Sequence, residues 1–359
     1  MSELGHTFDR LTLDGEQLTR TEAIERFAAL TDQRSEDRPW ATAVVKTLLD
    51  LGDTAGLHAT TSGTTGPPKQ FTIPRADLLA SARLTAATFG LRAGDRALHC
   101  LPSDFVAGKL MLVRGAVLGL DLHVIDPRGS VLEHLRTPDR FRFAAMVPLQ
   151  LLRALKEDRT RVEDQFETIL LGGGPVSQAL IDAVQGLRTT VHIGYGSTET
   201  VTHVALRTLN GAQRGVAFNA LGEVTFGRDP RGCLVVYTPH LNVPQHVTND
   251  LAEIIDDTHF LWLGRFDNVI LSGGKKIFPE QLEAKTAGVI PYAHYFASTP
   301  DERLGQAVLL VLECPKPEAE VMSEVMPALM SILHPHELPR KVRTVPIFER
   351  TSGGKVIRR

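Results

Sequence analysis

The stretch Thr60-Thr61-Ser62-Gly63-Thr64-Thr65-Gly66-Pro67-Pro68-Lys69 combines hydroxyl side chains with glycines and ends in a lysine. Gly63 and Gly66 allow the backbone to approach a ligand closely or to adopt positive φ. The hydroxyls and the ammonium of Lys69 can donate to several phosphate oxygens at once. We therefore expect this loop to bind a polyphosphate through Thr61, Ser62, Gly63, Thr64, Thr65, Gly66 and Lys69.

The loop differs from a Walker loop, in which the lysine follows the second glycine directly and a serine or threonine comes next. Here Pro67 and Pro68 precede the lysine, and Gln70 follows it. Residues 71–73 alternate as in a strand, and Pro74 disfavours a helix before residue 76. The loop is therefore expected to join two strands. A solvated turn rich in glycine, proline and threonine is the alternative.

Taken in order, these residues resemble the phosphate-binding signature of the adenylate-forming superfamily, which includes acyl-CoA synthetases, peptide-synthetase adenylation domains and luciferases. The resemblance implies that the loop binds the β- and γ-phosphates of ATP. It also implies that Mg²⁺ and, in the acyl-CoA synthetases, CoA take part in the reaction.

Composition sets the broad class of protein. Of the 359 residues, 43% are hydrophobic and 23% are charged, which is typical of a globular chain with about two domains. The net charge of -3, without basic runs interleaved with aromatics, argues against nucleic acid as a partner. Cys100, Cys233 and Cys314 are expected to be buried thiols of a reducing compartment. Because neither a signal peptide nor an apolar run of membrane length is present, we expect a cytoplasmic protein. A homodimer is compatible with the sequence.

Alternation of apolar strand-like runs with amphipathic helices over residues 57–265 predicts an α/β fold with a mostly parallel, helix-covered sheet. Thr19 and Glu22 predict a helix opened by a capping box. Short β-rich runs follow from about residue 215, and the polar break at 264–268 predicts a domain boundary. We expect a large domain over 1–265, with a shortened N-terminal part, and a small α+β domain over 266–359 on a hinge.

A second motif, Gly194-Tyr195-Gly196-Ser197-Thr198-Glu199-Thr200, follows the strand 191–193. Open α/β sheets bind ligands at the carboxyl ends of their strands. The aromatic ring can stack on a purine, Thr198 can donate to a phosphate oxygen, and Glu199 can bind magnesium. The superfamily resemblance implies catalytic roles for Thr198 and Glu199, with Glu199 as the metal ligand. It implies ATP contacts for Tyr195, Gly196 and Ser197, and for the glycine turn Gly172, Gly173 and Gly174. A surface turn leading into a helix is the alternative.

Later motifs match the superfamily in the same order. The resemblance implies that Asp250 accepts both ribose hydroxyls and that Arg265 lies near the ribose and phosphate. Asp267 resembles the hinge residue, and Gly273 and Gly274 resemble the loop that lines the pantetheine tunnel for CoA. Lys355, in 350–355, resembles the terminal lysine that bridges the acid and the α-phosphate during adenylation. Solvated charges are the alternative for Asp250 and Arg265, and a disordered basic terminus for Lys355.

The acid must be identified from the pocket. Lys109 and Arg114 lie on a largely apolar helix and could meet an anionic group of the substrate, or instead pair with acids or reach solvent. Residues 107–114, 200–207 and 248–251 resemble the compact o-succinylbenzoate–CoA ligases of menaquinone biosynthesis. The resemblance implies an acid-binding pocket with Phe105, Lys109, Arg114 and His203. Phe105 departs from the histidine that many of these ligases have.

The expected function is therefore ATP-dependent activation of a carboxylic acid as acyl-AMP, with release of pyrophosphate and transfer to CoA. The alternatives are adenylation of another aryl or fatty acid, with a carrier protein as the acceptor, and a non-catalytic nucleotide-binding protein. A kinase or simple ATPase would differ by releasing ADP.

Overall fold

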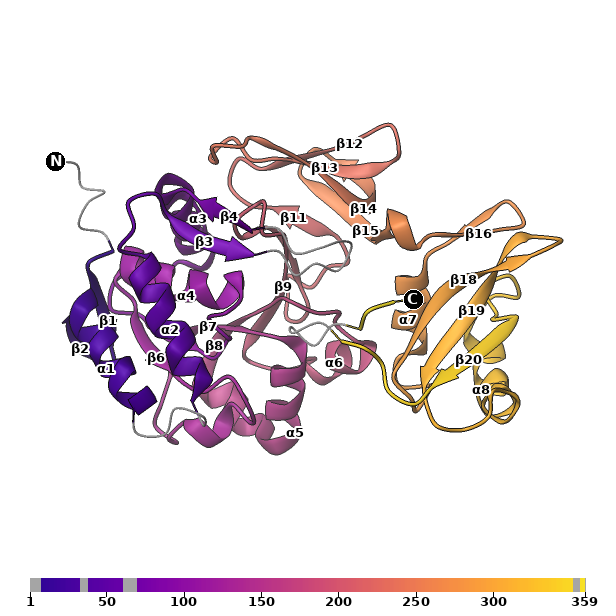
Figure 1. Ribbon diagram of the computed structural model, residues 1–359, viewed down its shortest axis with the longest axis horizontal. Coiled ribbons are helices and arrows are strands. Elements are labelled where there is room, and N and C mark those ends of the chain that lie inside the picture. Colours follow the sequence, from indigo (N-terminus) through magenta and orange to yellow (C-terminus); the bar gives the residue numbers. More distant parts are fainter. Residues whose placement is uncertain (1–7, 33–37, 61–69, 351–355, 359) are drawn as a thin grey trace. The chain divides into compact units, whose positions relative to one another are not determined.

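The computed structural model describes residues 8–32, 38–60, 70–350 and 356–358, which divide between two compact units (Figure 1). The first unit takes its residues from 1–175, 183–225 and 237–246, and the second from 176–182, 226–236 and 247–359. The predicted boundary after Arg265 falls inside the second unit, and the division into 1–265 and 266–359 stays a prediction. No helix in the described ranges is long and apolar enough to cross a membrane.

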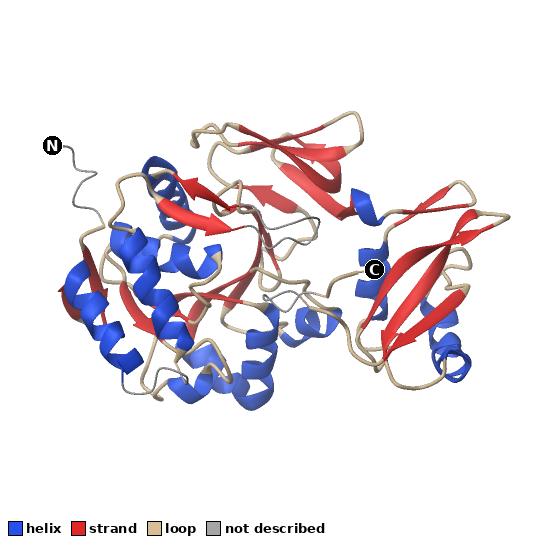
Figure 2. Ribbon diagram, viewed as in Figure 1, coloured by secondary structure: helices blue, strands red, loops and turns tan. Residues whose placement is uncertain are grey.

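A twisted sheet of strands in the order β11-β10-β9-β8-β7-β5-β6-β1-β2 forms the centre of the first unit (Figure 2). The strands β1 and β5 to β9 pair in parallel, whereas β2, β10 and β11 pair antiparallel. The predicted mostly parallel sheet is confirmed. The bounds of the strands are β1 Arg10–Leu13, β2 Glu16–Thr19, β5 Arg96–His99, β6 Asp121–Val124, β7 Phe141–Met146, β8 Phe166–Leu171, β9 Thr190–Gly196, β10 His203–Thr208 and β11 Phe218–Ala220.

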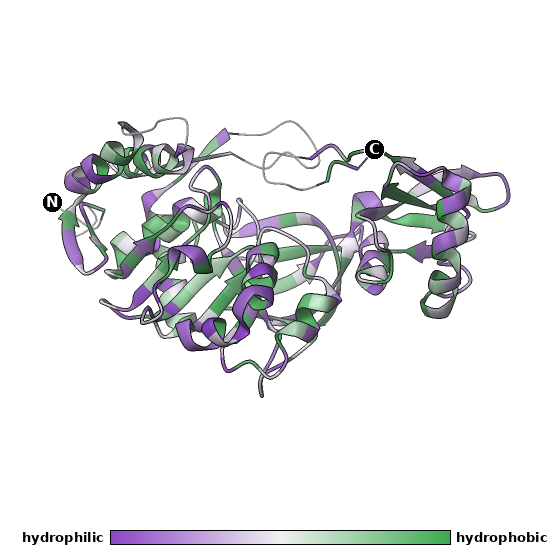
Figure 3. Ribbon diagram, turned by 90° about the horizontal axis from the view of Figure 1, so that it is seen from below, coloured by the Kyte–Doolittle hydropathy of each residue, from purple (hydrophilic) through white to green (hydrophobic). Residues whose placement is uncertain are grey.

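Hydrophobic strands and covering helices account for the core of this unit. The central strands are largely apolar (Figure 3), and Phe143, Ile169 and Val191 are fully buried. Both faces of such a sheet must be covered, which explains the apolar runs. The helices are α1 Arg20–Asp32, α2 Pro39–Asp50, α3 Arg75–Phe89, α4 Val106–Leu118 and α5 Pro148–Gln165, with a 3-10 turn, η2, at Leu132–His134. Helix α6, Gln178–Ala183, belongs to the second unit except for its last residue.

Helices α4 and α5 show how the sheet is wound. Helix α4 leads from β5 to β6 and α5 leads from β7 to β8, and each packs on the strands that it joins. The two connections run in opposite directions along the sheet. Because such crossovers are right-handed, the two helices cover opposite faces.

The predicted capping box is confirmed at the start of α1. The Thr19 amide donates to Glu22 Oε2 at 2.7 Å, and the Glu22 amide donates to Thr19 Oγ1 at 3.2 Å. These two bonds satisfy amides that have no partner within the helix.

Strands β3 (Leu57–Thr60) and β4 (Gln70–Ile73) form an antiparallel pair in which Leu57 lies opposite Ile73 and Thr60 opposite Gln70. The prediction that the phosphate-binding loop joins two strands is confirmed, although residues 61–69 lie outside the described ranges. Helix α3 begins at Arg75, one residue earlier than the limit that Pro74 suggested.

The second unit contains two groups of strands. Neighbouring strands β12 (Thr225–Arg228), β13 (Cys233–Tyr237), β14 (Gln245–Asp256) and β15 (His259–Arg265) come first, followed by the short 3-10 helix η3 (Phe266–Asn268). A five-stranded sheet with its own core then begins at Ile270. Its elements are β16 Ile270–Ser272, β17 Lys275–Ile277, α7 Pro279–Thr286, β18 His294–Asp301, β19 Gly305–Glu313, α8 Glu318–Ile332 and β20 Lys341–Val345. As predicted, Cys100, Cys233 and Cys314 are free and buried.

Candidate active site

One edge of the first unit's sheet collects the carboxyl ends of the parallel strands β5, β7, β8 and β9. Between β5 and β7 the two crossovers diverge, because β6 lies beyond β5 and β8 lies beyond β7. This is the topological switch point, where open α/β sheets bind ligands. The segments 172–174 and 197–202, which contain predicted site residues, leave β8 and β9 at this edge.

The glycine turn after β8 offers bare backbone at this edge. The Gly172 amide donates to the carbonyl of Met146 at the end of β7, at 3.1 Å. Gly173 has φ 76°, and a Cβ there would lie 3.4 Å from Val147 Cγ1. Because no described atom outside residues 171–173 lies within 4 Å of where a Cβ of Gly172 would be, a flat ring could approach this backbone closely.

The turn between β9 and β10 is held in one conformation by its own backbone and hydroxyls. A Cβ on Gly196 would lie 2.2 Å from the Thr202 carbonyl oxygen, so only glycine fits there. The hydroxyl of buried Thr200 accepts a hydrogen bond from the Ser197 amide at 2.9 Å and lies 2.9 Å from the Thr202 carbonyl. Val201 has φ 63°, a conformation that β-branched residues rarely adopt. Such local strain is typical of functional sites.

Predicted site residues occupy this turn and the strand before it. Tyr195 lies in β9 with its ring edge-on to Phe218 at 5.7 Å between centroids. Thr198 is half-buried and Glu199 is exposed in the turn itself. Within the described ranges, no three His, Cys, Asp or Glu side chains gather to hold a metal ion. One carboxylate at a ligand-binding edge nevertheless fits Mg²⁺, which proteins often hold by one or two carboxylates together with substrate phosphates.

Arg114 is the most unusual charged residue of the first unit. It lies on α4 and its exposed fraction is only 4%. Its guanidinium donates to Thr202 Oγ1 at 2.7 Å, to Thr85 Oγ1 at 3.2 Å and to the sulfur of Met111 at 3.5 Å. Among the described residues, no carboxylate forms an ion pair with it. Burial lowers the pKa of Arg114 to about 10, so the side chain stays charged at neutral pH in a site with neutral partners.

His203 and aromatic rings lie beside this guanidinium. His203 Nδ1 lies 3.0 Å from Thr202 Oγ1, and its Nε2 has no hydrogen-bond partner in the part of the chain that is described. Burial first, and then the charge of Arg114, lower the pKa of His203 well below its ordinary value, so the ring is neutral. The ring of Phe89 lies 5.8 Å from His203 and 5.6 Å from His192. A cluster of aromatic rings therefore contacts Thr202, the residue to which Arg114 donates.

The other predicted acid-binding residues lie elsewhere on α4. Lys109 Nζ donates to the His58 carbonyl at 2.7 Å and lies 3.5 Å from Asp50 Oδ2, so its charge is already paired. Phe105 is the N-cap residue of α4 and is partly buried. Arg114 and His203 therefore meet through Thr202, whereas Lys109 faces α2 and β3.

Asp250, Arg265 and Asp267 meet within the second unit. Asp250 and Arg265 lie opposite each other in the β14–β15 pair, with Arg265 Nη1 3.5 Å from Asp250 Oδ1. Arg265 Nη2 lies 3.9 Å from Asp267 Oδ2, which also accepts a hydrogen bond from Asn249 Nδ2 at 3.1 Å. The predicted ribose-binding carboxylate and the predicted hinge residue thus share one arginine.

Gly273 and Gly274 form the tight turn between β16 and β17, with φ 56° and 78°. Two successive positive φ values define the hairpin turn that favours glycine. The predicted residues Thr61, Ser62, Gly63, Thr64, Thr65, Gly66, Lys69 and Lys355 lie outside the described residues.

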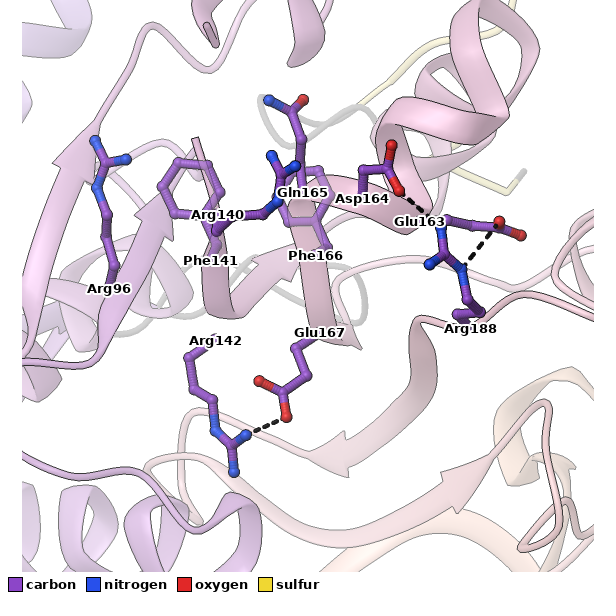
Figure 4. A pocket seen from close by; sticks show the side chains of 10 residues that line it. All are labelled: Arg96, Arg140, Phe141, Arg142, Glu163, Asp164, Gln165, Phe166, Glu167 and Arg188. Carbon is purple, nitrogen blue, oxygen red and sulfur yellow. Dashed lines mark hydrogen bonds and ion pairs between the residues drawn. The ribbon is translucent and has the colours of Figure 1, made fainter. Parts of the chain in front are cut away.

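A hollow of about 350 Å³ lies at the opposite edge of the first unit's sheet (Figure 4). Phe141 and Phe166, the first residues of the parallel strands β7 and β8, line it. Two of its arginines pair with carboxylates of the same hollow: Arg188 Nη2 lies 2.7 Å from Asp164 Oδ1, and Arg142 pairs with Glu167. Arg96 pairs with Asp139 outside the hollow. This hollow is distant from the carboxyl ends of the strands, so we do not assign the active site to it.

The neighbours of Arg114 include residues that sequence reasoning missed. Thr85 and Phe89 lie one turn apart on α3, and Met111 precedes Arg114 by one turn on α4. Nothing in their local sequence distinguishes them from ordinary core-facing positions. Residues 200–207 include Thr202 and His203, but the contact of Thr202 with Arg114 depends on the pairing of distant elements.

Known proteins resemble this chain over most of its length. The sequence profile described as "AMP-binding enzyme" matches residues 10–229. The chain is 29% identical over 335 residues to a protein of Mycobacterium tuberculosis H37Rv named "Probable 2-succinylbenzoate--CoA ligase", covering 86% of this chain and 84% of that one.

Solved structures give the same result. A crystal structure from Dyadobacter fermentans described as an acyl-CoA synthetase (AMP-forming)/AMP-acid ligase II-like protein has 37% identity, covers 89% of this chain and 92% of that one, and has a TM-score of 0.59. The o-succinylbenzoate coenzyme A synthetase of Bacillus subtilis, in complex with ATP and magnesium ion, shares the fold with a TM-score of 0.67 at 22% identity, covering 84% of this chain and 68% of that one. The profile match and the Dyadobacter relative together show that the chain belongs to the AMP-binding enzyme family.

Proposed function

We propose that this protein is an AMP-forming acid–CoA ligase and that its acid is o-succinylbenzoate, the substrate of the corresponding step of menaquinone biosynthesis. The observation that carries the choice of acid is the buried guanidinium of Arg114. It has neutral partners in Thr85 and Thr202, and no carboxylate partner among the described residues. A buried charge without a partner is costly, and a carboxylate can accept two parallel hydrogen bonds from a guanidinium. An aromatic acid with a second carboxylate supplies that group.

The aromatic part of such an acid also has a fitting environment. The neutral ring of His203 contacts Thr202, to which Arg114 donates, and Phe89 lies 5.8 Å from His203. Aromatic rings pack favourably edge-to-face or offset. Benzoate would fill this environment without pairing the guanidinium, and a fatty acid would bring neither a ring nor a second charge.

In the first step, one oxygen of the reacting carboxylate attacks the α-phosphorus of ATP, and the bond to pyrophosphate breaks. We assign Lys355 to offset the negative charge that develops and Thr198 to donate to an α-phosphate oxygen. Glu199 would hold Mg²⁺, which when bound neutralises phosphate charge. The loop 61–69 would bind the leaving phosphates.

Asp250 would accept the ribose hydroxyls, held in place by Arg265 at 3.5 Å. Tyr195 would lie against the adenine beside the Gly172–Gly174 turn. In the second step the sulfur of CoA attacks the acyl carbonyl and AMP leaves, with Gly273 and Gly274 lining the path of the thiol. Rotation of the C-terminal domain about Asp267 would replace the orientation that serves adenylation by the one that serves thioester formation. We place the reaction in the cytoplasm, because free buried cysteines suit a reducing compartment, and a homodimer stays a prediction.

The test is acid-dependent exchange of ATP with labelled pyrophosphate, measured with o-succinylbenzoate, benzoate and a long-chain fatty acid. The fatty acid belongs in the panel because a long-chain-fatty-acid–CoA ligase of Mycobacterium tuberculosis is 25% identical to this chain. We expect the highest specificity constant for o-succinylbenzoate. Exchange with benzoate or the fatty acid alone would refute the choice of acid while keeping the ligase chemistry.

A further inference from the structure

The end of the chain is fastened to the second unit on both sides of residues 351–355. Arg350 and Val356 form an antiparallel bridge, and the Ile357 amide donates to the Glu349 carbonyl at 2.9 Å. We propose that Arg358, together with Arg350, is a positioning residue for the adenylation step, because the two guanidinium groups anchor both flanks of the segment that ends in Lys355. The proposal rests on the proposed function of Lys355.

The upstream anchor is a two-point ion pair. Arg350 Nη1 and Nη2 donate to the two carboxylate oxygens of Glu313 at 2.8 and 2.6 Å. Glu313 ends β19, and its Oε1 also accepts the Phe348 amide at 2.8 Å. These hydrogen bonds, with that of Arg350 first, lower the pKa of Glu313 to about 2, so the anchor is charged throughout the physiological range. Two parallel bonds fix the direction of the arginine as well as its distance.

The downstream anchor lies on α7. Arg358 Nη2 donates to Glu283 Oε2 at 2.7 Å, and Nη1 lies 3.8 Å from Glu280 Oε1. The guanidinium also lies over the ring of Tyr295, 5.7 Å from its centroid. The Glu283 carboxylate is oriented in turn, because its Oε1 accepts the Phe296 amide at 3.0 Å. The side chain of Arg358 is 30% exposed and that of Glu283 22%, so the pair is partly shielded from water.

The downstream anchor connects with the predicted hinge. Asn268, the last residue of η3, donates from Nδ2 to Glu280 Oε1. Asn268 directly follows Asp267 in the sequence. Glu280 of α7 therefore contacts both the predicted hinge segment and Arg358. If Lys355 is to reach a phosphate, the residues that flank its segment must be held in place, because a displacement of about 1 Å at a reacting group can cost on the order of 100-fold in rate.

A role of Arg358 in fold stability alone would explain the same contacts, so the test must measure adenylation and thiolysis separately. Adenylation is measured as acid-dependent ATP–pyrophosphate exchange, and thiolysis as acyl-CoA formation from supplied acyl-adenylate and CoA. The variants are Arg358→Met, Arg358→Lys and Lys355→Ala. Lys285→Met is the matched control, because it removes an ion pair from the same helix, Lys285 Nζ to Glu337 Oε1 at 2.8 Å, without touching the terminal segment. Assays at about pH 8 keep Glu283 ionised, since burial raises its pKa to about 7.

We expect Arg358→Met to slow adenylation roughly 10- to 100-fold while thiolysis stays within about twofold of the wild type. Arg358→Lys should recover part of the adenylation rate, because lysine keeps the charge but not the two-pronged geometry. Lys285→Met should leave both rates unchanged.

The proposal is overturned if Arg358→Met leaves adenylation unchanged, or if it slows both half-reactions equally together with a lower thermal unfolding midpoint. The Lys355→Ala variant tests the proposed function itself. If it does not slow adenylation selectively, the assigned role of Lys355 is wrong, and the positioning role of Arg358 is refuted as well.

Discussion

Replacing Arg114 by methionine is expected to separate the role of this residue in substrate choice from its effect on stability. Methionine fills a similar apolar volume but brings neither charge nor donors. In the wild type the guanidinium is 4% exposed and donates to Thr202 at 2.7 Å and Thr85 at 3.2 Å. The substitution therefore removes a buried charge that destabilises the free protein. It also removes the proposed partner of the second carboxylate of the bound acid.

The expected loss in kcat/KM for o-succinylbenzoate follows from the proposed ion pair between Arg114 and the second carboxylate of the acid. Removing one partner of a buried charge pair costs about 3 to 4 kcal/mol of binding. At about 1.4 kcal/mol for each factor of ten, kcat/KM for o-succinylbenzoate should fall roughly 100- to 1,000-fold. For benzoate, which lacks the second carboxylate, the same variant should change kcat/KM by less than about threefold, because no charge pair is lost.

The stability of the free protein should move in the opposite direction. The lowering of the Arg114 pKa from 12.5 to about 10 corresponds to about 3 kcal/mol against the charged form. The two lost hydrogen bonds offset about 1 kcal/mol each. Both hydroxyls keep another partner, because Thr85 Oγ1 donates to the Ser81 carbonyl and Thr202 Oγ1 contacts His203 Nδ1. We expect the free energy of unfolding to rise by about 1 kcal/mol.

Steady-state pyrophosphate release with both acids, and urea unfolding without ligand, measure the two effects. Arg114→Lys is the control, because it keeps the charge but not the fork and should lose less of the preference for the dicarboxylate. An equal loss of kcat/KM for both acids would refute the substrate role of Arg114. A large fall in stability would refute the view that its charge is uncompensated in the free protein.

Three further predictions concern other parts of the chain. Lys355→Ala should slow adenylate formation by more than 100-fold, as expected for loss of a group that stabilises the transition state, and largely spare thiolysis of supplied acyl-adenylate; equal loss of both steps would contradict it. Gly196→Ala should lower the free energy of unfolding by roughly 1 to 3 kcal/mol in urea titration, because the added Cβ would lie 2.2 Å from the Thr202 carbonyl oxygen; an unchanged midpoint would show that the β9–β10 turn can adjust. Burial raises the pKa of Glu283 from 4.5 to about 7, so the folded protein binds this proton more readily than the unfolded chain, and the resulting stabilisation of roughly 3 kcal/mol should be lost as pH rises between these values; Glu283→Gln should remove that part of the pH dependence, and identical slopes for the two proteins would contradict the assignment.

Local patterns in the sequence predict elements well where the cause is local. The capping box at Thr19 and Glu22 depends on residues three apart, and both of its hydrogen bonds are present. The short β-rich runs predicted from about residue 215 include the apolar residues Cys233–Tyr237, which form β13. The strands on either side of the predicted phosphate-binding loop were also predictable, because the alternation at 71–73 indicates a strand and Pro74 marks where β4 ends.

Other features depend on contacts between distant segments. Arg114 donates to Thr85 and Thr202, which are 29 and 88 residues away, so its burial could not be distinguished from solvation in the sequence. Lys109 lies five residues before Arg114, on another side of α4, and pairs with Asp50 and the His58 carbonyl instead.

Helix α5 shows a further limit. The apolar residues within 149–155 indicate a helix there, but the helix continues through a kink at Asp158 to Gln165. Its second half is polar apart from Val162, which is fully buried, so packing of a few residues sustains it where the local pattern fades.

The most direct test of the central claim is to quantify the products of a single reaction with ATP, Mg²⁺, CoA and o-succinylbenzoate. The account predicts AMP, pyrophosphate and o-succinylbenzoyl-CoA in equal amounts, and no AMP when the acid is left out. Formation of ADP and phosphate, or release of AMP that does not depend on the acid, would contradict it.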